Sequence, residues 1–428
     1  MKTATDAEVE TSLQFLAELF ENSPLSQVAV QLWEGTLWPD HAPRAATLVL
    51  NHPGALRAMF NAGTEMGLAE AYLHDDFDVV GDMEAAFEIA DVLGKGLGWK
   101  RSLALMSLLR KLPGGERRGS AREFIGRLGR RHSPARDRNA ISFHYDVSSD
   151  FYRLWLDRQM VYSCAYFEEP GNDLDTAQTA KLDHICRKLR LKPGQRLLDI
   201  GCGWGGLVLH AARHYGVDAT GITLSEKQAE LATARAAEAG LSQRVHIYLR
   251  DYRDLDEGMP FDVIVSVGMS EHVGAENLPT YFRKAHAVLK PGGVFLNHAI
   301  GEGARHRPTE GPSFIDEYVF PDSEIPPVQT VLVSAASAGF EIRDVENLRE
   351  HYALTLRHWV HRLEARHEEA LAYVSEETYR VWRLYMAGSA HGFAHGRLAI
   401  YQALLAKPDE TGNARVPLTR RDWYGRGG

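Results

Sequence analysis

The sequence has few cysteines and lacks the cysteine patterns that disulfide frameworks and zinc sites use. Its 428 residues contain three cysteines, Cys164, Cys186 and Cys202. No CxxC or similar metal-ligand spacing occurs among them. A small, odd number of cysteines is typical of reduced thiols in a reducing compartment. We therefore expect neither a disulfide framework nor a metal site.

Long apolar runs are also missing. No stretch of about 18 or more apolar residues occurs, which argues against a membrane-spanning helix. Residues 1–14 lack the basic, apolar and small-residue regions of a signal peptide. The composition is 44% hydrophobic and 25% charged, which is ordinary for a globular chain long enough for two or three domains. The sequence therefore predicts a cytoplasmic protein.

Positive charge is scarce overall but concentrated in one segment. The chain carries a net charge of −9, whereas residues 95–138 hold 13 Lys and Arg against three Asp and Glu, a local charge of +10. This segment has only two aromatic residues, Trp99 and Phe124, and matches no nucleic-acid-binding module, so nucleic acid is not expected as a partner. Residues 99–112 predict an amphipathic helix with four leucines on one side. Such a helix either lies on anionic lipid or is a solvated linker whose leucines pack on a domain.

The first part of the chain predicts a small α+β domain. Residues 11–20, 55–60 and 63–77 have helical patterns, and residues 27–33 and 46–50 have strand patterns. This domain either has no chemistry of its own or holds an apolar substrate. We expect an N-terminal domain at residues 1–94, a basic amphipathic linker at 95–140 and the main domain at 141–428.

Strands and helices alternate along the main domain. Strands are expected at residues 197–200, 219–222, 245–249, 261–267 and 293–298, with helices between most of them and a final strand at 342–348. Long helical stretches, 358–373 and 376–405, follow. The alternation predicts an α/β fold with a doubly wound, largely parallel, Rossmann-like sheet. Ligands of such sheets bind at the carboxyl ends of the strands.

A glycine-rich turn follows the first strand of this sheet. Gly201, Gly203 and Gly206 form a GxGxxG pattern, which lets the backbone approach a nucleotide closely. The pattern alone is weak, because enzymes that bind NAD and enzymes that bind S-adenosylmethionine (SAM) share it. It therefore predicts a nucleotide site without identifying the nucleotide.

The ends of the next two strands distinguish the two cofactors. An NAD site is expected to have an acidic residue after the second strand, to bind the ribose hydroxyls. That strand instead ends in Thr223 and Leu224, and Ser225 and Gln228 are spaced as a cap for the next helix. The third strand ends in Asp251-Tyr252, a carboxylate and a ring suited to an adenine. These features favour SAM over NAD.

Several segments resemble one family in sequence and in order. They are HYDVSSDFY, YSCAYFE, LDIGCGWGGL, GITLSEKQ, RDYRDL, SVGMSEHVG, FLNHAIG and HYALTLRHW, all within residues 141–406. This set resembles the SAM-dependent family of cyclopropane-fatty-acid synthases and mycolic-acid methyltransferases. The segment GTEMGLAEAYLHDDFDV resembles the small lipid-associated domain of the members that modify phospholipids.

The resemblance implies a reaction on unsaturated acyl chains of membrane phospholipids. In the family, a cis double bond attacks the sulfonium methyl group of SAM, and loss of a proton from the added methyl closes a cyclopropane ring. Members hold a bicarbonate ion as the base. The resemblance also implies a protein at the inner membrane face, docked on anionic lipid through residues 95–138. A homodimer is one option.

The resemblance further implies two sets of site residues. The bicarbonate site would comprise Cys164, Glu271, His298, Ile300 through its backbone, and Tyr352. The SAM site would comprise Tyr162, Ser163, Gly201, Gly203, Thr223, Leu224, Gln228, Asp251 and Tyr252. Cys164 is then a ligand to a small anion and not a nucleophile.

The sequence also departs from the family pattern. Ser270 stands where an aromatic residue is common, Ala299 replaces a common threonine, and His391 and His395 occur in an unfamiliar late segment. These differences leave the product open between a cyclopropane and a methylene- or methyl-branched chain. Two other interpretations stay open, a methyltransferase for a small soluble molecule and a lipid-binding protein with a vestigial site.

Overall fold

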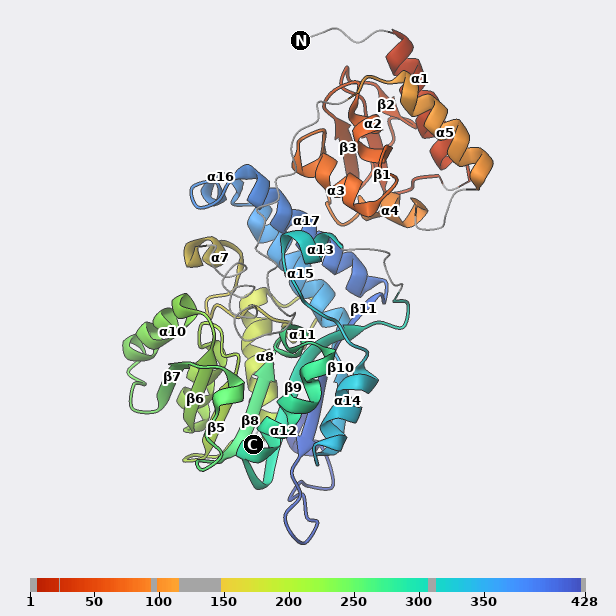
Figure 1. The fold of residues 1–428 in the computed structure, drawn as a ribbon. Helices are drawn as coiled ribbons and strands as arrows, with labels where there is room; N and C mark the ends of the chain where they lie inside the picture. The colour runs from red at the N-terminus through yellow and green to blue at the C-terminus, as the bar shows by residue number, and fades with distance from the viewer. Residues whose placement is uncertain (1–5, 23, 94–97, 115–147, 307–312, 425–428) are drawn as a thin grey trace. The chain divides into compact units, whose positions relative to one another are not determined.

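A computed structural model describes residues 6–22, 24–93, 98–114, 148–306 and 313–424 (Figure 1). The chain divides into two compact units. The first comprises Met1–Phe124, Thr309–Val319 and Ser375–His391, and the second comprises Ile125–Pro308, Phe320–Val374 and Gly392–Gly428. Most of the predicted linker, residues 115–140, lies outside the described residues. Within the described residues, no helix combines the length and apolar character needed to cross a bilayer.

The first unit is built on a four-stranded sheet in the order β2-β1-β3-β4. Its strands are β1 (Val28–Gln31), β2 (Leu37–Trp38), β3 (Ala46–Leu50) and β4 (Phe77–Gly81). Its helices are α1 (Asp6–Phe20), α2 (Ala55–Phe60), α3 (Glu65–Leu73), α4 (Phe87–Leu93), α5 (Trp99–Lys111), α13 (Phe314–Tyr318) and most of α17 (Glu376–Ala394). The predicted α+β class is confirmed.

The helix predicted at 63–77 is shorter in the structure, and strand β4 begins at the last of these residues. Helix α3 ends at Leu73, and Asp75 adopts a left-handed conformation with φ of 62°. A left-handed residue cannot continue an α-helix, so the chain turns here and enters β4. Strand β4 then pairs antiparallel with β3, from Phe77 opposite Leu50 to Gly81 opposite Ala46.

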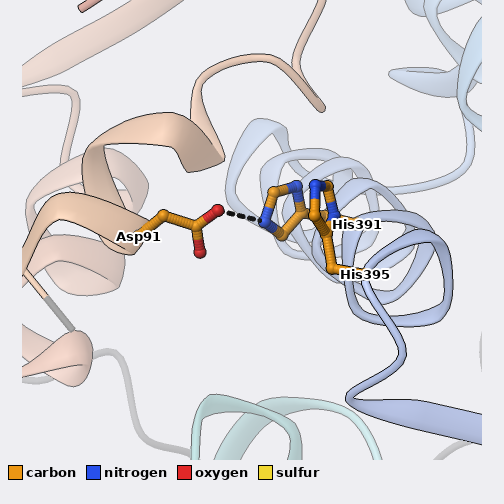
Figure 2. A group of neighbouring side chains, drawn as sticks. All are labelled: Asp91, His391 and His395. Atoms are coloured by element: carbon orange, nitrogen blue, oxygen red, sulfur yellow. Dashed lines mark hydrogen bonds and ion pairs between the residues drawn. The ribbon is translucent and has the colours of Figure 1, made fainter. Parts of the chain in front are cut away.

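Residues 375–391 return to the first unit from far along the sequence. Two buried arginines of α17 form ion pairs with an acid just before β4 and an acid within it: Arg380 lies 2.7 Å from Asp75, and Arg383 lies 3.3 Å from Asp78. Figure 2 shows His391 of the same helix, whose Nε2 lies 3.0 Å from the carboxylate of Asp91. The third residue drawn, His395, belongs to the second unit.

Helix α5 buries the leucine face that its sequence predicted. Leu105, Leu108 and Leu109 are buried, and the guanidinium of Arg101 donates to the main-chain oxygen of Glu18 in α1. The leucines therefore pack inside the first unit, as expected for a helix that covers a domain. The outer face of α5 remains exposed.

The second unit contains a seven-stranded sheet in the order β10-β11-β9-β8-β5-β6-β7. Its strands are β5 (Arg196–Ile200), β6 (Asp218–Thr223), β7 (Val245–Leu249), β8 (Phe261–Val267), β9 (Leu289–Glu302), β10 (Glu341–Asn347) and β11 (Leu398–Ala406). Strands β5 to β9 pair parallel, whereas β11 pairs antiparallel with β9 and β10. The predicted doubly wound, largely parallel sheet is confirmed.

Helices cover both faces of this sheet. The helices of the unit are α7 (Ser149–Trp155), α8 (Leu174–Lys188), α9 (Gly206–Tyr215), α10 (Glu226–Glu238), α11 (Ser270–Val273), α12 (Leu278–Val288), α14 (Val328–Ser337), α15 (Arg349–Glu364), α16 (His367–Ala370) and α18 (Arg421–Tyr424), with short 3-10 helices η1 (Tyr252–Asp254) and η2 (Ala275–Asn277). Neighbours on β5 point to opposite cores: Leu197 packs with residues of α8 and α9, and Leu198 packs with residues of α12 and α14. Burial on both faces explains the continuous apolar character of the strands.

The predicted helix at 376–405 is wrong in about its last third. Helix α17 ends at Ala394, and Gly396 adopts φ of 72°. The apolar run that follows forms β11, which inserts between β9 and β10. Its pairing with β9 extends that strand to Glu302, beyond the predicted end at 298. The helix expected at 358–373 instead begins at Arg349 and ends at Glu364.

Candidate active site

A pocket lies at the carboxyl ends of β5, β6 and β8. It is lined by residues 160–163, by Lys181 and Leu182 of α8, by most of residues 199–207, by 222–224 and Gln228, by Arg250 and Tyr252, and by 267–269 and His272. This is the edge at which a doubly wound sheet binds ligands, and the site was predicted there.

The glycine turn shapes one wall of the pocket. Gly201 and Gly203 adopt φ of 86° and 53°, a left-handed conformation that favours glycine. A Cβ atom at Gly206 would lie 2.9 Å from the Val161 side chain and 3.0 Å from the main-chain oxygen of Gln159. The turn therefore needs glycine both for its conformation and for its close contact with residues 159–161.

Eight of the nine predicted SAM residues line this pocket. They are Tyr162, Ser163, Gly201, Gly203, Thr223, Leu224, Gln228 and Tyr252. The ninth, Asp251, does not line it. Its carboxylate forms an ion pair with Arg253 at 2.7 Å and caps η1. The structure therefore places Tyr252 in the pocket and holds Asp251 beside it, bonded to Arg253.

The end of β6 has the polar, uncharged character that the sequence indicated. The Thr223 hydroxyl donates to Oε1 of Gln228 at 2.7 Å. Ser225 Oγ accepts from the main-chain N–H of Gln228 and begins α10, so the predicted cap is confirmed. The hydrogen bond between Thr223 and Gln228 holds the two side chains together on the pocket wall.

The five residues predicted to hold bicarbonate lie in the second unit, and four of them are buried. Cys164, Glu271, His298 and Tyr352 are each at most 6% exposed. Glu271 Oε1 accepts the main-chain N–H of Ile300 at 2.7 Å. His298 and Ile300 are two residues apart on β9 and share one face of the sheet. The Cys164 thiol lies 3.8 Å from the main-chain oxygen of Leu348, directly before α15, which carries Tyr352.

Two buried polar atoms of this group have no hydrogen-bond partner among the described residues. They are Oε2 of Glu271 and Nε2 of His298. The other ring nitrogen of His298, Nδ1, lies 3.1 Å from Nε2 of Gln402 on β11. Leaving a buried polar atom unpaired costs about 1–3 kcal/mol. A small polar ligand group that bonded either atom would remove this cost.

Burial also determines the charge of these side chains. It raises the pKa of Glu271 to about 7, although the Ile300 N–H partly opposes this effect. It lowers the pKa of His298 well below the usual value, with a smaller contribution from Lys181, so the imidazole is neutral near pH 7. Burial raises the pKa of Cys164, which keeps the thiol protonated. Cys164 can therefore donate a hydrogen bond but is not a thiolate nucleophile.

Aromatic rings connect the pocket with Tyr352. The Tyr162 ring lies 5.5 Å from Trp155 and 5.2 Å from Trp359, between ring centroids. Tyr352 lies 6.0 Å from Trp359 and 4.7 Å from Phe393. Aromatic faces attract cations, most strongly where water is excluded. Sequence reasoning did not single out Trp359, although it closes the HYALTLRHW segment.

Two charged residues in the pocket wall were not among the predicted site residues: Asp199 was expected only as a polar residue at the end of its strand, and Lys181 was missed. Lys181 is 1% exposed and Asp199 is 2% exposed, and both line the pocket. Oδ1 of Asp199 is buried without a partner among the described residues, and burial raises the pKa of this carboxyl to about 7. A signal was present: both charges occupy positions where the helix and strand patterns require apolar residues.

The sheet order, the glycine turn after β5 and the uncharged end of β6 define a SAM-dependent methyltransferase. Comparison with known proteins then identifies the family. The profile described as mycolic acid cyclopropane synthetase matches residues 132–403, and the chain belongs to this family.

Two curated relatives show the extent of the similarity. The chain is 41% identical over 400 residues to a probable fatty acid methyltransferase of Pseudomonas putida, covering 92% of this chain and 95% of the relative. It is 40% identical over 269 residues to the cyclopropane-fatty-acyl-phospholipid synthase of Escherichia coli (strain K12), covering 63% and 68%.

Two solved structures each match 63% of the chain. The cyclopropane synthase MmaA2 from Mycobacterium tuberculosis is 36% identical with a TM-score of 0.60, covering 63% of this chain and 98% of that one. The mycolic acid cyclopropane synthase CmaA1, complexed with SAH and CTAB, is 35% identical with a TM-score of 0.59, covering 63% and 97%. The resemblance inferred from the sequence motifs is confirmed.

Proposed function

We propose that this methyltransferase adds the methyl carbon of SAM to the cis double bond of unsaturated acyl chains in membrane phospholipids, and that the product is a cyclopropane. The observation that carries the proposal is that residues of the cofactor pocket and residues of the predicted bicarbonate group are direct neighbours in the sequence. Ser163 lines the cofactor pocket and Cys164 follows it; Met269 and His272 line the pocket, and Glu271 lies between them. The names of the fatty-acid and fatty-acyl-phospholipid relatives support this substrate class.

The cofactor, when bound, supplies an electrophilic methyl group, so the chain's residues mainly position reactants and exclude water. The glycine turn and the bonded pair Thr223 and Gln228 form walls of the pocket that would hold it. Tyr162 lines the pocket, and its ring packs against that of Trp359 at 5.2 Å between centroids. These rings stabilise positive charge on the acyl chain without offering a nucleophile to trap it.

Bicarbonate fits the buried polar group, and when bound it supplies the base for the proton that the acyl chain loses. Neutral His298 would donate from Nε2, because Nδ1 faces the amide of Gln402. The Cys164 thiol and the main chain of Ile300 complete this group, in which the Ile300 N–H already donates to Glu271. With a pKa of about 7, Glu271 can carry a proton beside an anion, which avoids the repulsion between two like charges.

The outer face of α5 is the surface that we propose for docking on anionic lipid. Trp99 is 70% exposed and Leu103, one turn further, is 62% exposed. Lys100, Arg110 and Lys111 are exposed on the same helix. Exposed apolar side chains flanked by basic ones are typical of helices that lie at the surface of anionic membranes.

The direct test is mass spectrometry of acyl chains after incubation of the protein with SAM and vesicles of unsaturated anionic phospholipid. We expect a gain of one CH2, and derivatisation should show that the double bond is gone. The same gain with unsaturation retained would identify a methylene-branched chain, an alternative that the departures at Ser270 and Ala299 from the family pattern leave open. Vesicle binding without any mass gain would identify a lipid-binding protein with a vestigial site and would refute the proposal.

A further inference from the structure

Lys181 places a buried ammonium at the edge of the cofactor pocket. It lies in the middle of α8, is 1% exposed and lines the pocket. Its Nζ donates to Oγ of Ser163 at 2.7 Å, which is its one hydrogen bond among the described residues. An ammonium has three donors, so two of them are available to a ligand.

Two carboxyl groups act on this cation, but neither bonds it directly among the described residues. Asp157 and Asp199 are the carboxyl groups whose charges favour its protonated form, while burial lowers the pKa of Lys181 to about 8. The Asp157 carboxylate already accepts two main-chain N–H groups, from Gln159 and Val161, each at 2.8 Å. Removing an ammonium from water is costly unless it is paired. An anionic ligand group in the pocket would complete the pairing.

The ligand class identifies that group. SAM carries two positive groups, the sulfonium and the α-ammonium, and one negative group, the α-carboxylate. A buried lysine repels the first two and attracts the third. We propose that Lys181, together with the Ser163 hydroxyl that it holds, binds the α-carboxylate of the cofactor. Ser163 Oγ accepts from Lys181, so its own proton is free to be donated to the same carboxylate.

This inference rests on the identification of the pocket as a SAM site, and it can be tested by binding alone. The ligands are S-adenosylhomocysteine (SAH) and 5′-methylthioadenosine, which retains the adenosine and thioether but lacks the amino-acid end. Calorimetry of Lys181→Met should show about 10- to 100-fold weaker binding of SAH, the loss expected for a charged hydrogen bond. The affinity for methylthioadenosine should change little. Equal weakening of both ligands would overturn the inference.

Lys188→Met is the matched control. Lys188 lies on the same helix and is 0% exposed, but it forms an ion pair with Glu346 at 2.5 Å and is not among the pocket-lining residues. Its replacement should lower stability while leaving the ratio of the two ligand affinities unchanged. A change of that ratio equal to the one in Lys181→Met would also overturn the inference.

A measurement on the unaltered protein keeps the inference falsifiable if Lys181→Met does not fold. The carboxamide of SAH has no negative charge, so the wild type should bind it about 10- to 100-fold more weakly than SAH. Equal affinity would contradict the inference. Failure of the proposed acyl-chain reaction is distinguishable, because it leaves SAH binding intact and only the lipid unmodified.

Discussion

Burial, more than residue type, determines what Glu271 does in this protein. Its carboxyl has one main-chain donor, the Ile300 N–H, and a second oxygen without a partner among the described residues. Burial therefore raises its pKa from 4.5 to about 7. Burial lowers the pKa of His298, so its imidazole remains neutral near pH 7. Below about pH 7 both side chains are therefore uncharged.

The raised pKa of Glu271 predicts a pH-dependent effect of Glu271→Gln on stability. The unfolded carboxyl ionises near its usual pKa of 4.5, whereas the folded one stays protonated up to about 7. The wild type therefore loses stability as the pH rises through this interval, and the glutamine variant does not. Between about pH 5 and pH 8, the free energy of unfolding of the variant should rise relative to that of the wild type by on the order of 2–3 kcal/mol. Urea-denaturation midpoints measure the difference.

Glu410→Gln, on an exposed turn, is the control for this measurement. Its urea-denaturation midpoint should change between about pH 5 and pH 8 as that of the wild type does. If the stability of Glu271→Gln also has the same pH dependence as that of the wild type, burial does not hold the Glu271 carboxyl in its neutral form.

At this scale the sequence predicted the site through the order of its motifs and not through single residues. Cys164, His298 and Tyr352 are individually compatible with ordinary core positions, and only the family pattern assigned them to one site. Asp251 shows the limit of the pattern, because its carboxylate bonds Arg253, two residues away, and that contact is invisible in a motif. Lys181 was missed because buried charges are rare, so a helix pattern does not predict them.

The β5–α9 turn is the element that forms the pocket wall. Gly201 follows β5 with φ of 86°, and a Cβ atom there would lie 3.2 Å from the Met269 side chain. Gly201→Ala should therefore lower stability by about 1–3 kcal/mol through backbone strain. It should also weaken SAH binding, because Met269 lines the same pocket and must move. Thermal unfolding and calorimetry measure the two effects.

Gly240 offers a matched control for the turn. It adopts φ of 68°, and an added Cβ atom would meet nothing within 4 Å. Gly240→Ala should show a similar loss of stability with unchanged SAH affinity. Unchanged SAH affinity in Gly201→Ala would show that the turn does not shape the cofactor site.

Element prediction succeeded where the local pattern and the tertiary environment agree. Strands β3, β7 and β8 and helix α2 have the predicted bounds, because short apolar runs between turn residues determined them. Strand β11 was missed, because LAIYQALLA also fits a helix that continues from α17. Its strand conformation depends on pairing with β9 and β10, which are remote in the sequence.

At the scale of the whole molecule, the chain combines a catalytic unit with a smaller α+β unit that carries an exposed apolar and basic helix face. The sequence indicated both parts. It did not indicate that residues 375–391 group with the smaller unit, because that grouping depends on contacts such as Arg380 with Asp75. The boundaries at residues 94 and 140 stay predictions.

The outer face of α5 predicts a separable effect on membrane binding. The double variant Trp99→Ser, Leu103→Ser should sediment less with vesicles of anionic phospholipid, because two exposed apolar side chains no longer enter the lipid interface. SAH affinity should stay at the wild-type value, since these residues belong to the other unit. Leu418→Ser, at a fully exposed leucine of the second unit, is the control. Equal sedimentation of all three proteins would exclude α5 as the docking face.

The most direct test of the proposed reaction follows the methyl group itself. The protein is incubated with SAM that carries a trideuterated methyl group and with vesicles of unsaturated anionic phospholipid, and the acyl chains are analysed by mass spectrometry. Cyclopropane formation with loss of a proton from the transferred methyl predicts one added carbon with two deuterium atoms and no remaining double bond. Acyl chains that contain no deuterium would contradict methyl transfer to lipid, and an added carbon that keeps all three deuterium atoms would contradict loss of the proton from that methyl.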